Sequence, residues 1–358
     1  MITSSMAQQV PAEPPSLVFG RWRRRGQSNQ IRDITSLGCQ AAGVFDLASV
    51  TKVLATTTAL MRLASMGRLD VDAPVATWIP GLALHEGTTV ADLLEHQAGL
   101  VQWQPFYLAP EVRQLPAGQR RDMTLRLVGA MPPQWGLRQG RHYSDLGFIL
   151  LGHLIEVITG MRLDQAIAML VTEPMRWRLG YGPVRSGAVT SQTGDAAEKR
   201  MVTTGEPYPV QWSDEGFAWR EDMITGQVND GNAFHAMDGV SGHAGLFGTL
   251  DQMMEAGMAL AMAEQDRQFF DPGVVRRFMT PGVDPGQALG WRCDTLQVDG
   301  ESMPMRYHLG FTGMGLGFVP GGGRVIALAS NRLMADPAPR TDQLWHRACA
   351  WATRPEDE

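Results

Sequence analysis

The chain has 358 residues, of which 44% are hydrophobic and 19% are charged, and its formal net charge is −6 at pH 7. Such a composition excludes disordered and fibrous proteins, and the acidic balance gives no reason to expect nucleic acid as a partner. The length fits either one domain with a sizeable insertion or two domains.

The chain begins with a polar, proline-containing segment, residues 1–15, which we expect to be a flexible tail. This segment lacks the basic start and the apolar stretch of a signal peptide, so the sequence predicts a cytoplasmic protein. The longest apolar stretch, 146–160, contains His153 and Glu156 and is too short for a membrane span. No membrane partner is therefore expected.

Three cysteines, Cys39, Cys293 and Cys349, occur without a CxxC pair and without a histidine at zinc-ligand spacing. An odd number of cysteines in such a pattern is typical of free thiols in a reducing compartment. No group of carboxylates and histidines has metal-ligand spacing, and no glycine-rich loop follows a strand as a phosphate site requires. We therefore expect neither a metal nor a cofactor.

The segments with helical periodicity lie between residue 49 and about residue 265. The expected helices cover 49–66, 88–100, 120–131, 145–172 with a break at Gly160, and 249–265. Between 175 and 245 the sequence is rich in Gly, Pro and Trp and shows little periodicity. Glycine-rich turns then separate four short strands, and a last helix follows: strands 287–298, 305–311, 314–320 and 323–331, and helix 340–352.

Consecutive hairpin strands predict an antiparallel sheet, so the expected fold class is α+β, with the sheet flanked by helices. We expect a sheet domain formed by both ends of the chain, residues 16–80 and 266–352. A mostly helical domain, residues 81–265, is expected to be inserted between them, with the active site between the two domains. The sequence does not indicate an oligomeric state.

Lysine is scarce in this chain. Only Lys52 and Lys199 are lysines among the 31 basic residues. Arg is effectively always protonated, whereas a buried Lys can lose its proton. Lys52 lies three residues after Ser49 at the start of a helical pattern, which places both side chains on one face, where a neutral amine can take the serine proton. Taken alone, the pair fits a helix-capping serine and a snorkelling lysine better than a catalytic pair.

Two further stretches carry polar residues that fit the same site. "GRHYSDLGF" places Tyr143 directly before an expected helix, with Asp145 in the first turn of that helix. "YHLGF" places His308 two residues before Gly310 on an expected strand, and a glycine there lets a substrate lie against the strand edge. Taken singly, these stretches also fit an ordinary helix start and a strand with a surface histidine.

In this order and at these intervals, "SVTK", "YSD" and "HLG" resemble the S-x-x-K, Y-x-N and [KH]-[TS]-G motifs of a family of serine hydrolases. That family includes class C β-lactamases, DD-peptidases and their esterase relatives. "TTVADLLEHQAGL" and "GVSGHAGLFGTLDQM" are similar to further segments of it. The resemblance covers roughly residues 35 to 335 and implies the β-lactamase/transpeptidase-like fold.

The resemblance also implies a role for each matching residue. Ser49 would attack a carbonyl carbon and become acylated. Lys52 and Tyr143 would share the proton transfers, and which of them is the base stays open. The oxyanion hole would consist of the backbone N–H groups of Ser49 and Phe311, and donors of this kind supply about 3 kcal/mol each of transition-state stabilisation.

Asp145 and His308 depart from the family pattern. Asp145 stands where the family usually has Asn, so it accepts hydrogen bonds from Lys52, cannot donate to a substrate amide, and favours a charged lysine. His308 stands where β-lactamases commonly have Lys, and Leu309 replaces a small hydroxyl residue. Asp145, His308 and Gly310 are thus expected to support the site without the cation and the hydroxyl that would hold a β-lactam carboxylate.

The sequence therefore predicts a serine hydrolase that forms an acyl-enzyme on Ser49, as an esterase or amidase acting on small carboxylic esters or amides. A β-lactamase or D-amino-acid peptidase with the same machinery is an alternative, with a lactam or a peptide amide as substrate. An acyltransferase, or a non-catalytic binding protein on the same fold, is a further alternative. The expected partner is a small molecule.

Several other residues are weaker candidates. His243 in "SGHAGLFG" is expected to be a structural histidine under a glycine turn. Asn232 in "VNDGNAF" is a candidate to reach the cleft. Trp103, Trp135 and Trp219 fit either the wall of an acyl pocket or the core.

Overall fold

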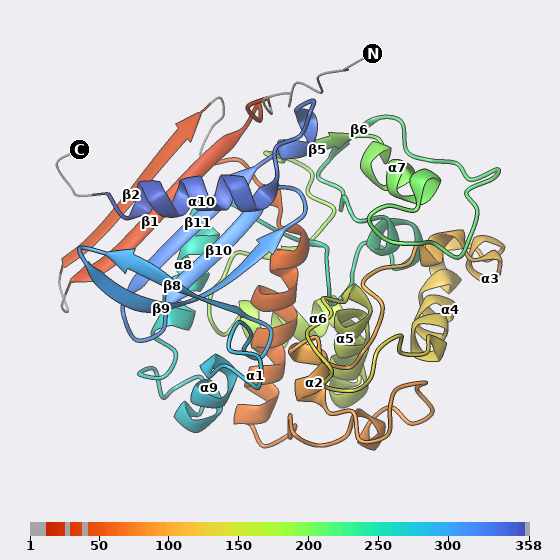
Figure 1. Cartoon of the computed structure of the whole chain (residues 1–358), viewed down its shortest axis with the longest axis horizontal. Helices are drawn as coiled ribbons and strands as arrows, with labels where there is room; N and C mark the ends of the chain where they lie inside the picture. Colours follow the sequence, from red (N-terminus) through yellow and green to blue (C-terminus); the bar gives the residue numbers. More distant parts are fainter. Residues whose placement is uncertain (1–11, 26–28, 38–41, 355–358) are drawn as a thin grey trace, which may run out of the picture.

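The computed structural model describes residues 12–25, 29–37 and 42–354. Its central feature is a six-stranded sheet in which every neighbouring pair of strands runs antiparallel. The strand order is β2–β1–β11–β10–β9–β8, with the bounds Asn29–Leu37, Leu17–Arg25, Arg324–Ser330, Met314–Val319, Glu301–Gly310 and Arg292–Val298. Both ends of the chain therefore build this sheet (Figure 1).

A helix covers each face of the sheet. α10, Thr341–Ala352, crosses the face seen in Figure 1 and seats its Trp345 ring on β10. Gly315 and Gly317 leave room for this ring, because a Cβ there would lie only 2.6 and 2.9 Å from it. α8, Leu250–Ala261, packs against β1, β10 and β11 from behind. The segment 81–265, expected as the inserted part, thus contributes α8 to the sheet.

A continuous helical segment stands between the sheet and the helical half of the molecule (Figure 1). It starts as a 3₁₀ turn, Ala48–Val50, continues as a π-helical stretch, Lys52–Thr57, and ends as α1, Thr58–Ser65. Every residue of the π-helical stretch is buried. This segment corresponds to the helix predicted over 49–66.

The helical half is organised around α5, Asp145–Thr159. Three helices pack against it: α2, Val90–Leu94; α4, Ala117–Ala130; and α6, Leu163–Ile167. α5 begins at Ser144, whose Oγ caps the first turn by accepting the Gly147 N–H. It ends at Gly160, whose φ of +72° is a conformation that glycine adopts readily. The predicted break at Gly160 is therefore confirmed.

Some elements differ from the sequence-based expectation. The helix expected over 88–100 is only α2, because His96 at φ +58° and Gly99 at φ +74° turn the chain out of the helix. Short elements lie within 175–245 and before and after it: β4, Gly180–Tyr181; β5, Thr190–Thr193; α7, Ala196–Thr204; β6, Met223–Thr225; α3, Pro110–Arg113; and α9, Pro272–Met279.

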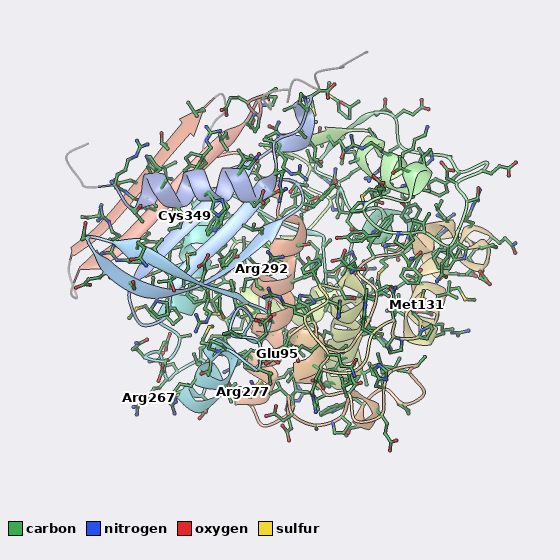
Figure 2. The ribbon with its side chains drawn as sticks, in the orientation of Figure 1. Glu95, Met131, Arg267, Arg277, Arg292 and Cys349 are labelled. Atoms are coloured by element: carbon green, nitrogen blue, oxygen red, sulfur yellow. The ribbon has the colours of Figure 1, made fainter. Side chains whose placement is uncertain are left out.

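Within the described residues, no single helix has both the length and the hydropathy needed to cross a membrane; α5 with Leu163–Thr172 reaches them only as a pair bent by 75°. Cys293 and Cys349 are free thiols, as predicted, and burial raises the pKa of both. Figure 2 shows Cys349 on α10. Cys39 and residues 1–11 of the expected tail lie outside the described residues.

Candidate active site

Ser49 stands in a tight turn between a short strand and the buried helical segment. The strand β3, Phe45–Asp46, pairs with β7, Leu246–Gly248, and Ala48 then takes a φ of +45°, which residues other than glycine adopt rarely. Ser49 is the second residue of the 3₁₀ turn, so its N–H is one of those that a helix leaves without an intrahelical acceptor. This N–H is therefore available to a ligand.

Lys52 lies one turn further along the helix, with its side chain fully buried. Its Nζ donates hydrogen bonds to Ser49 Oγ at 2.8 Å and to the His243 carbonyl oxygen at 3.3 Å. On its other side the same Nζ forms an ion pair with Asp145 Oδ1 at 2.7 Å. The spacing of three residues thus brings the amine against the hydroxyl, and α5 supplies the carboxylate that holds the amine.

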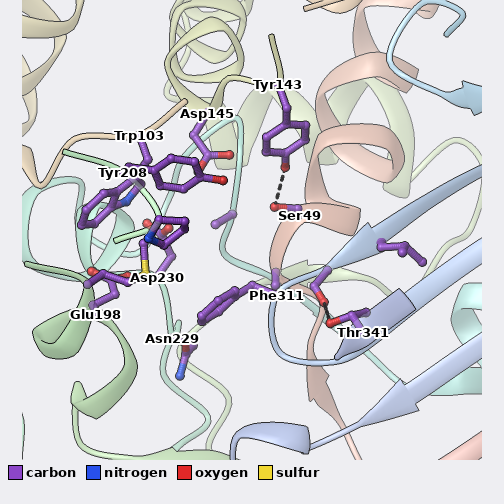
Figure 3. A pocket seen from close by; sticks show the side chains of 16 residues that line it. Ser49, Trp103, Tyr143, Asp145, Glu198, Tyr208, Asn229, Asp230, Phe311 and Thr341 are labelled. Atoms are coloured by element: carbon purple, nitrogen blue, oxygen red, sulfur yellow. Dashed lines mark hydrogen bonds between the residues drawn. The ribbon is translucent and has the colours of Figure 1, made fainter. Parts of the chain in front are cut away.

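Tyr143 reaches the same serine from the start of α5. Its hydroxyl donates a hydrogen bond to Ser49 Oγ at 3.0 Å (Figure 3). The next residue, Ser144, donates its N–H to His96 Nδ1 at 3.1 Å, and the His96 ring lies 4.6 Å from the Tyr143 ring. Burial lowers the pKa of His96, so the ring stays neutral and Nδ1 remains an acceptor. His96 thereby fixes the position of Tyr143.

The ion pair with Asp145 decides the charges at rest. Burial alone lowers the pKa of Lys52, but the Asp145 carboxylate and Tyr143 outweigh burial, and the pKa of Lys52 is raised. Burial raises the pKa of the Tyr143 phenol. The resting site therefore holds an ammonium at Lys52 and a neutral phenol at Tyr143. The neutral amine suggested by the scarcity of lysine is not the resting form, because Asp145 replaces an uncharged Asn.

The end of β9 abuts the Ser49 turn. Gly310 is its last residue, and a Cβ there would lie 2.8 Å from the Leu47 carbonyl oxygen and 3.3 Å from Ala48 Cβ. The missing side chain therefore makes room for the protein's own backbone rather than for a substrate. Phe311 follows directly, and it lines the same pocket as Ser49. The two residues expected to form the oxyanion hole are thus brought together.

His308 lies behind this strand end. Its ring is buried, 6.2 Å from the Tyr143 ring, and its Nδ1–H donates to the Leu309 carbonyl oxygen at 2.8 Å. Burial, aided by the charges of Lys52 and Arg292, lowers the pKa of His308 well below its usual value. His308 therefore supplies no positive charge, in keeping with the expected loss of a fixed cation.

A pocket of about 300 Å³ opens beside Ser49 (Figure 3). Among the described residues that line it are three carboxylates and several aromatic rings, and none of them is basic. The carboxylates are Asp145, Glu198 and Asp230, and the aromatic residues besides Tyr143 are Trp103, Tyr208 and Phe311. The wall of this pocket is therefore lined by carboxyl groups and aromatic rings.

Sequence reasoning does not find Glu198 and Asp230. Glu198, on α7, accepts hydrogen bonds from the Tyr107 hydroxyl and the Gly231 N–H, both at 2.7 Å, and burial raises its pKa to about 8. Asp230 bonds His243 Nε2 at 2.9 Å. Burial opposes ionisation of Asp230, but His243 outweighs it and the pKa of Asp230 is lowered. Two adjacent pocket carboxyls thus have different charge states.

In the segment "VNDGNAF", Asn229 and Asp230 line the pocket, whereas the candidate Asn232 is fully buried and donates to the Gln104 carbonyl oxygen. The segment therefore reaches the pocket, as expected, but it does so through Asn229 and Asp230 and not through Asn232. The only local signal was an acidic residue before a glycine.

Of the three tryptophans, Trp103 lines the pocket. Trp135 stacks on the His142 ring, and Trp219 packs against Tyr107 and Phe217. These two rings are therefore packing residues, the second of the two roles that the sequence left open.

Asp145, Asp230 and His243 offer ligand atoms within 4.8 Å of one another. Lys52 lies among them, since its ammonium pairs with Asp145 and bonds the His243 carbonyl oxygen. The positive charge at this point thus comes from Lys52. His243 is buried between Ser241 Oγ and Asp230, the structural position expected for it.

Known proteins resemble this chain in sequence or in structure. The family model described as Beta-lactamase matches residues 25–349. An N-acetylmuramyl-L-alanine amidase from Bacillus subtilis is 36% identical over 261 residues, which are 70% of this chain and 57% of that protein. A putative D-alanyl-D-alanine carboxypeptidase from Escherichia coli is 30% identical over 316 residues, which are 82% of this chain and 71% of that protein.

A solved structure confirms the fold. The penicillin-binding protein from Bacillus halodurans superposes with a TM-score of 0.65 at 18% identity, and the match covers 93% of this chain and 96% of that one. The family model spans the sheet from the end of β1 to α10 together with the whole helical half. The chain belongs to the Beta-lactamase family, and its relatives named amidase and carboxypeptidase mark it as a serine hydrolase of that family.

Proposed function

We propose that the protein cleaves amide or ester bonds by forming an acyl-enzyme on Ser49. The observation that carries this proposal is the contact set around Ser49 Oγ, which has Lys52 Nζ at 2.8 Å and the Tyr143 hydroxyl at 3.0 Å. A serine hydroxyl becomes a nucleophile when a neighbouring group takes its proton, and both partners are within hydrogen-bond reach.

The proton of Ser49 leaves through Lys52. Because Lys52 is charged at rest and has no free electron pair, it takes this proton while it passes one of its own to Asp145, whose Oδ1 lies 2.7 Å from Nζ. The Oγ–C bond then forms, and the carbonyl electron pair moves to oxygen. Asp145 can store the proton, which the amide of an Asn cannot do at neutral pH.

Tyr143 acts on the leaving-group side. Its phenol donates a proton to the leaving nitrogen or oxygen as the C–N or C–O bond breaks, and Asp145 returns the stored proton to Tyr143 through Lys52. Water then attacks the acyl-enzyme by the same steps. The N–H groups of Ser49 and Phe311 hold the oxyanion in both halves of the reaction, at about 3 kcal/mol for each donor.

The charge of the pocket supports a neutral or positively charged acyl group. Asp145, Glu198 and Asp230 line it, with Asp230 ionised and Glu198 mostly protonated at pH 7, and no basic side chain does so among the described residues. Like charges placed against each other are unfavourable by several kcal/mol, so an acyl group with its own carboxylate is disfavoured. This preference favours an esterase or amidase over a β-lactamase.

A carboxypeptidase is a second candidate, favoured by one specific observation. Arg292, at the start of β8, holds its guanidinium 5.9 Å from the centre of the Tyr143 ring. Figure 2 shows it at the end of the sheet that faces α1. A cation beside the residue that protonates the leaving group suits a leaving group with a free carboxylate, such as a terminal amino acid.

Burst kinetics and intact-protein mass spectrometry with three alanine p-nitroanilides test the proposal. The three substrates carry a free amino group, an N-acetyl group or an N-succinyl group, so they differ in the charge of the acyl part. We expect a Ser49 acyl adduct with the first two, little with the succinyl substrate, and none in Ser49→Ala.

Parallel reactions separate the alternatives. A burst with nitrocefin would favour a β-lactamase, and release of D-alanine from a peptide ending in D-alanyl-D-alanine would favour a carboxypeptidase. An acylated product after adding an amine acceptor would reveal acyl transfer. No adduct with any substrate would contradict catalysis and favour a binding protein. A cytoplasmic location is part of the proposal, and cell fractionation tests it.

A further inference from the structure

We propose that Asp46 is a positioning residue that locks three separate walls of the active site to one another. The inference rests on the proposed function, because it takes Ser49 as the nucleophile. Asp46 lies in β3 with only 3% of its surface exposed, and it is not among the described residues that line the pocket. It therefore acts through its neighbours rather than by touching a substrate.

The Asp46 carboxylate holds two of these walls. Oδ1 accepts the Ala48 N–H at 2.8 Å, and Oδ2 accepts the Asn229 N–H at 2.6 Å. The third wall is held by the backbone, because Thr312 Oγ1 donates to the Asp46 carbonyl oxygen at 3.0 Å. Each of the three partners is the immediate chain neighbour of a pocket residue: Ser49, Asp230 and Phe311.

The bond to Ala48 stabilises a strained turn. A residue other than glycine keeps a φ of +45° only where its surroundings hold it there. A carboxylate that accepts a backbone N–H forms a stronger bond than a neutral acceptor does. Asp46 supplies such a bond directly before Ser49, so it sets the direction in which both Oγ and N–H of Ser49 point.

The bond to Asn229 fixes the acidic wall relative to that turn. Arg220 holds the same segment from the other side, since its guanidinium donates to the carbonyl oxygens of Val228 and Asn229. Burial raises the pKa of Asp46 to about 6, which leaves the carboxylate mostly ionised at pH 7 and able to accept both N–H groups. The charged groups that act on it are Asp230 and Arg220.

The decisive experiment compares Asp46→Asn with wild type by the rate at which a fluorophosphonate labels Ser49. In this reaction the Oγ–P bond forms, the P–F bond breaks, fluoride leaves, and the Ser49 proton passes through Lys52 to Asp145. The variant keeps the shape of the side chain but places an NH₂ donor against one of the two N–H groups. We expect the second-order labelling rate to fall at least tenfold while the labelled fraction stays complete.

Asp92→Asn is the matched control. Asp92 is equally buried, caps the start of α2 and pairs with Arg138, and neither residue is among the described lining of the pocket. We expect this control to lower the melting temperature yet to label at the wild-type rate within twofold. If Asp46 had a purely structural role, Asp46→Asn would lower the melting temperature or the labelled fraction and leave the labelling rate unchanged, as in the control. That result would overturn the inference.

Thr312→Val keeps the inference testable if Asp46→Asn does not fold. Valine preserves the shape of threonine and removes only the hydroxyl that bonds the Asp46 carbonyl oxygen. We expect a several-fold slower labelling rate, and an unchanged rate in this variant would overturn the inference. Absence of labelling in wild type is a different result, since it would overturn the proposed function and this inference with it.

Discussion

The two sides of the Ser49 pocket are carried by different kinds of segment. On the catalytic side, Lys52 is three residues from Ser49, and one helix start supplies both Tyr143, 94 residues from Ser49, and Asp145. On the acyl side, which Glu198 and Asp230 line, Glu198 is held by a hydroxyl 91 residues away in the chain. Both sides therefore depend on long-range contacts, but the catalytic groups stand at helix starts with a recognisable spacing, whereas the acyl side comes from a segment with little periodicity.

The charges of the two sides differ as well. The Asp145 carboxylate is paired with the Lys52 ammonium, while Glu198 has only neutral hydrogen-bond partners, a phenol and a backbone N–H. On the catalytic side, the charges of Lys52 and Asp145 therefore balance each other before a substrate binds. On the acyl side, Asp230 is bonded to His243 and Glu198 is mostly protonated at pH 7, so a bound ammonium group can draw Glu198 into its ionised form.

Lys52→Arg breaks the catalytic side and should have the largest effect. Arginine keeps the positive charge but does not release a proton, so the relay from Ser49 to Asp145 stops. We expect kcat to fall about 1,000-fold, within the range for loss of a general base. Lys199→Arg, at the other lysine and on the exposed surface of α7, should retain full activity. Comparable burst rates in the two variants would rule out the relay.

Gly310→Ala disturbs the contact between β9 and the Ser49 turn. The added Cβ would meet the Leu47 carbonyl oxygen at 2.8 Å, so the strand end and the Phe311 N–H must move away from Ser49. We expect kcat/KM to fall about tenfold, less than the loss of a whole oxyanion donor. Gly118→Ala, in α4 with no atom within 4 Å of the new Cβ, should leave kcat/KM unchanged. Equal kcat/KM values in both variants would show that the contact is dispensable.

Glu198→Gln sharpens the comparison on the acyl side. Glu198 is mostly protonated in the empty pocket at pH 7, and a bound ammonium group favours its ionised form. Removing this carboxyl should therefore weaken the preference for the free-amino alanine p-nitroanilide over the acetyl one about fivefold, because the ammonium loses a group that ionises beside it. The ratio of the two kcat/KM values measures this effect. Glu215→Gln, at an exposed glutamate, serves as the control and should leave the ratio as it is.

The same variant should change how stability depends on pH. Burial raises the pKa of Glu198 from 4.5 to about 8, so between these values the folded protein binds more protons at this group than the unfolded chain does. The free energy of unfolding therefore falls as the pH rises from 4.5 to 8. Glu198→Gln has no carboxyl to titrate here, so its stability does not fall for this reason. The difference in melting temperature, variant minus wild type, should therefore increase from pH 5 to pH 8. A constant difference would mean that Glu198 titrates normally.

The sequence predicts the catalytic side well, because its signals are local or lie in short ordered motifs. Ser49 and Lys52 follow from helical spacing, and glycine-rich turns mark the strand that carries Gly310. The resting charge of Lys52 does not follow from spacing, since it depends on the Asp145 carboxylate at 2.7 Å.

The acyl side escapes prediction for a physical reason. Glu198 and Asp230 belong to a segment without regular periodicity, so no pattern indicates which side chains point into the pocket. Asp46 is similar, because its partner Asn229 lies 183 residues further along the chain. Within the fold, α9 has a strong capping aspartate, Asp271, and a proline at its first position, a signal that the sequence-based prediction did not use.

The pairing of β1 with β11 determines when a newly made chain can become active. Leu17 pairs with Ser330, so this part of the sheet closes only after nearly the whole sequence has left the ribosome. The helices around α5 contact one another over shorter distances in the chain and can pack sooner. A nascent chain therefore contains Ser49 and Lys52 long before β9 and Phe311 are made, so the proposed oxyanion hole would be the last part of the site to form.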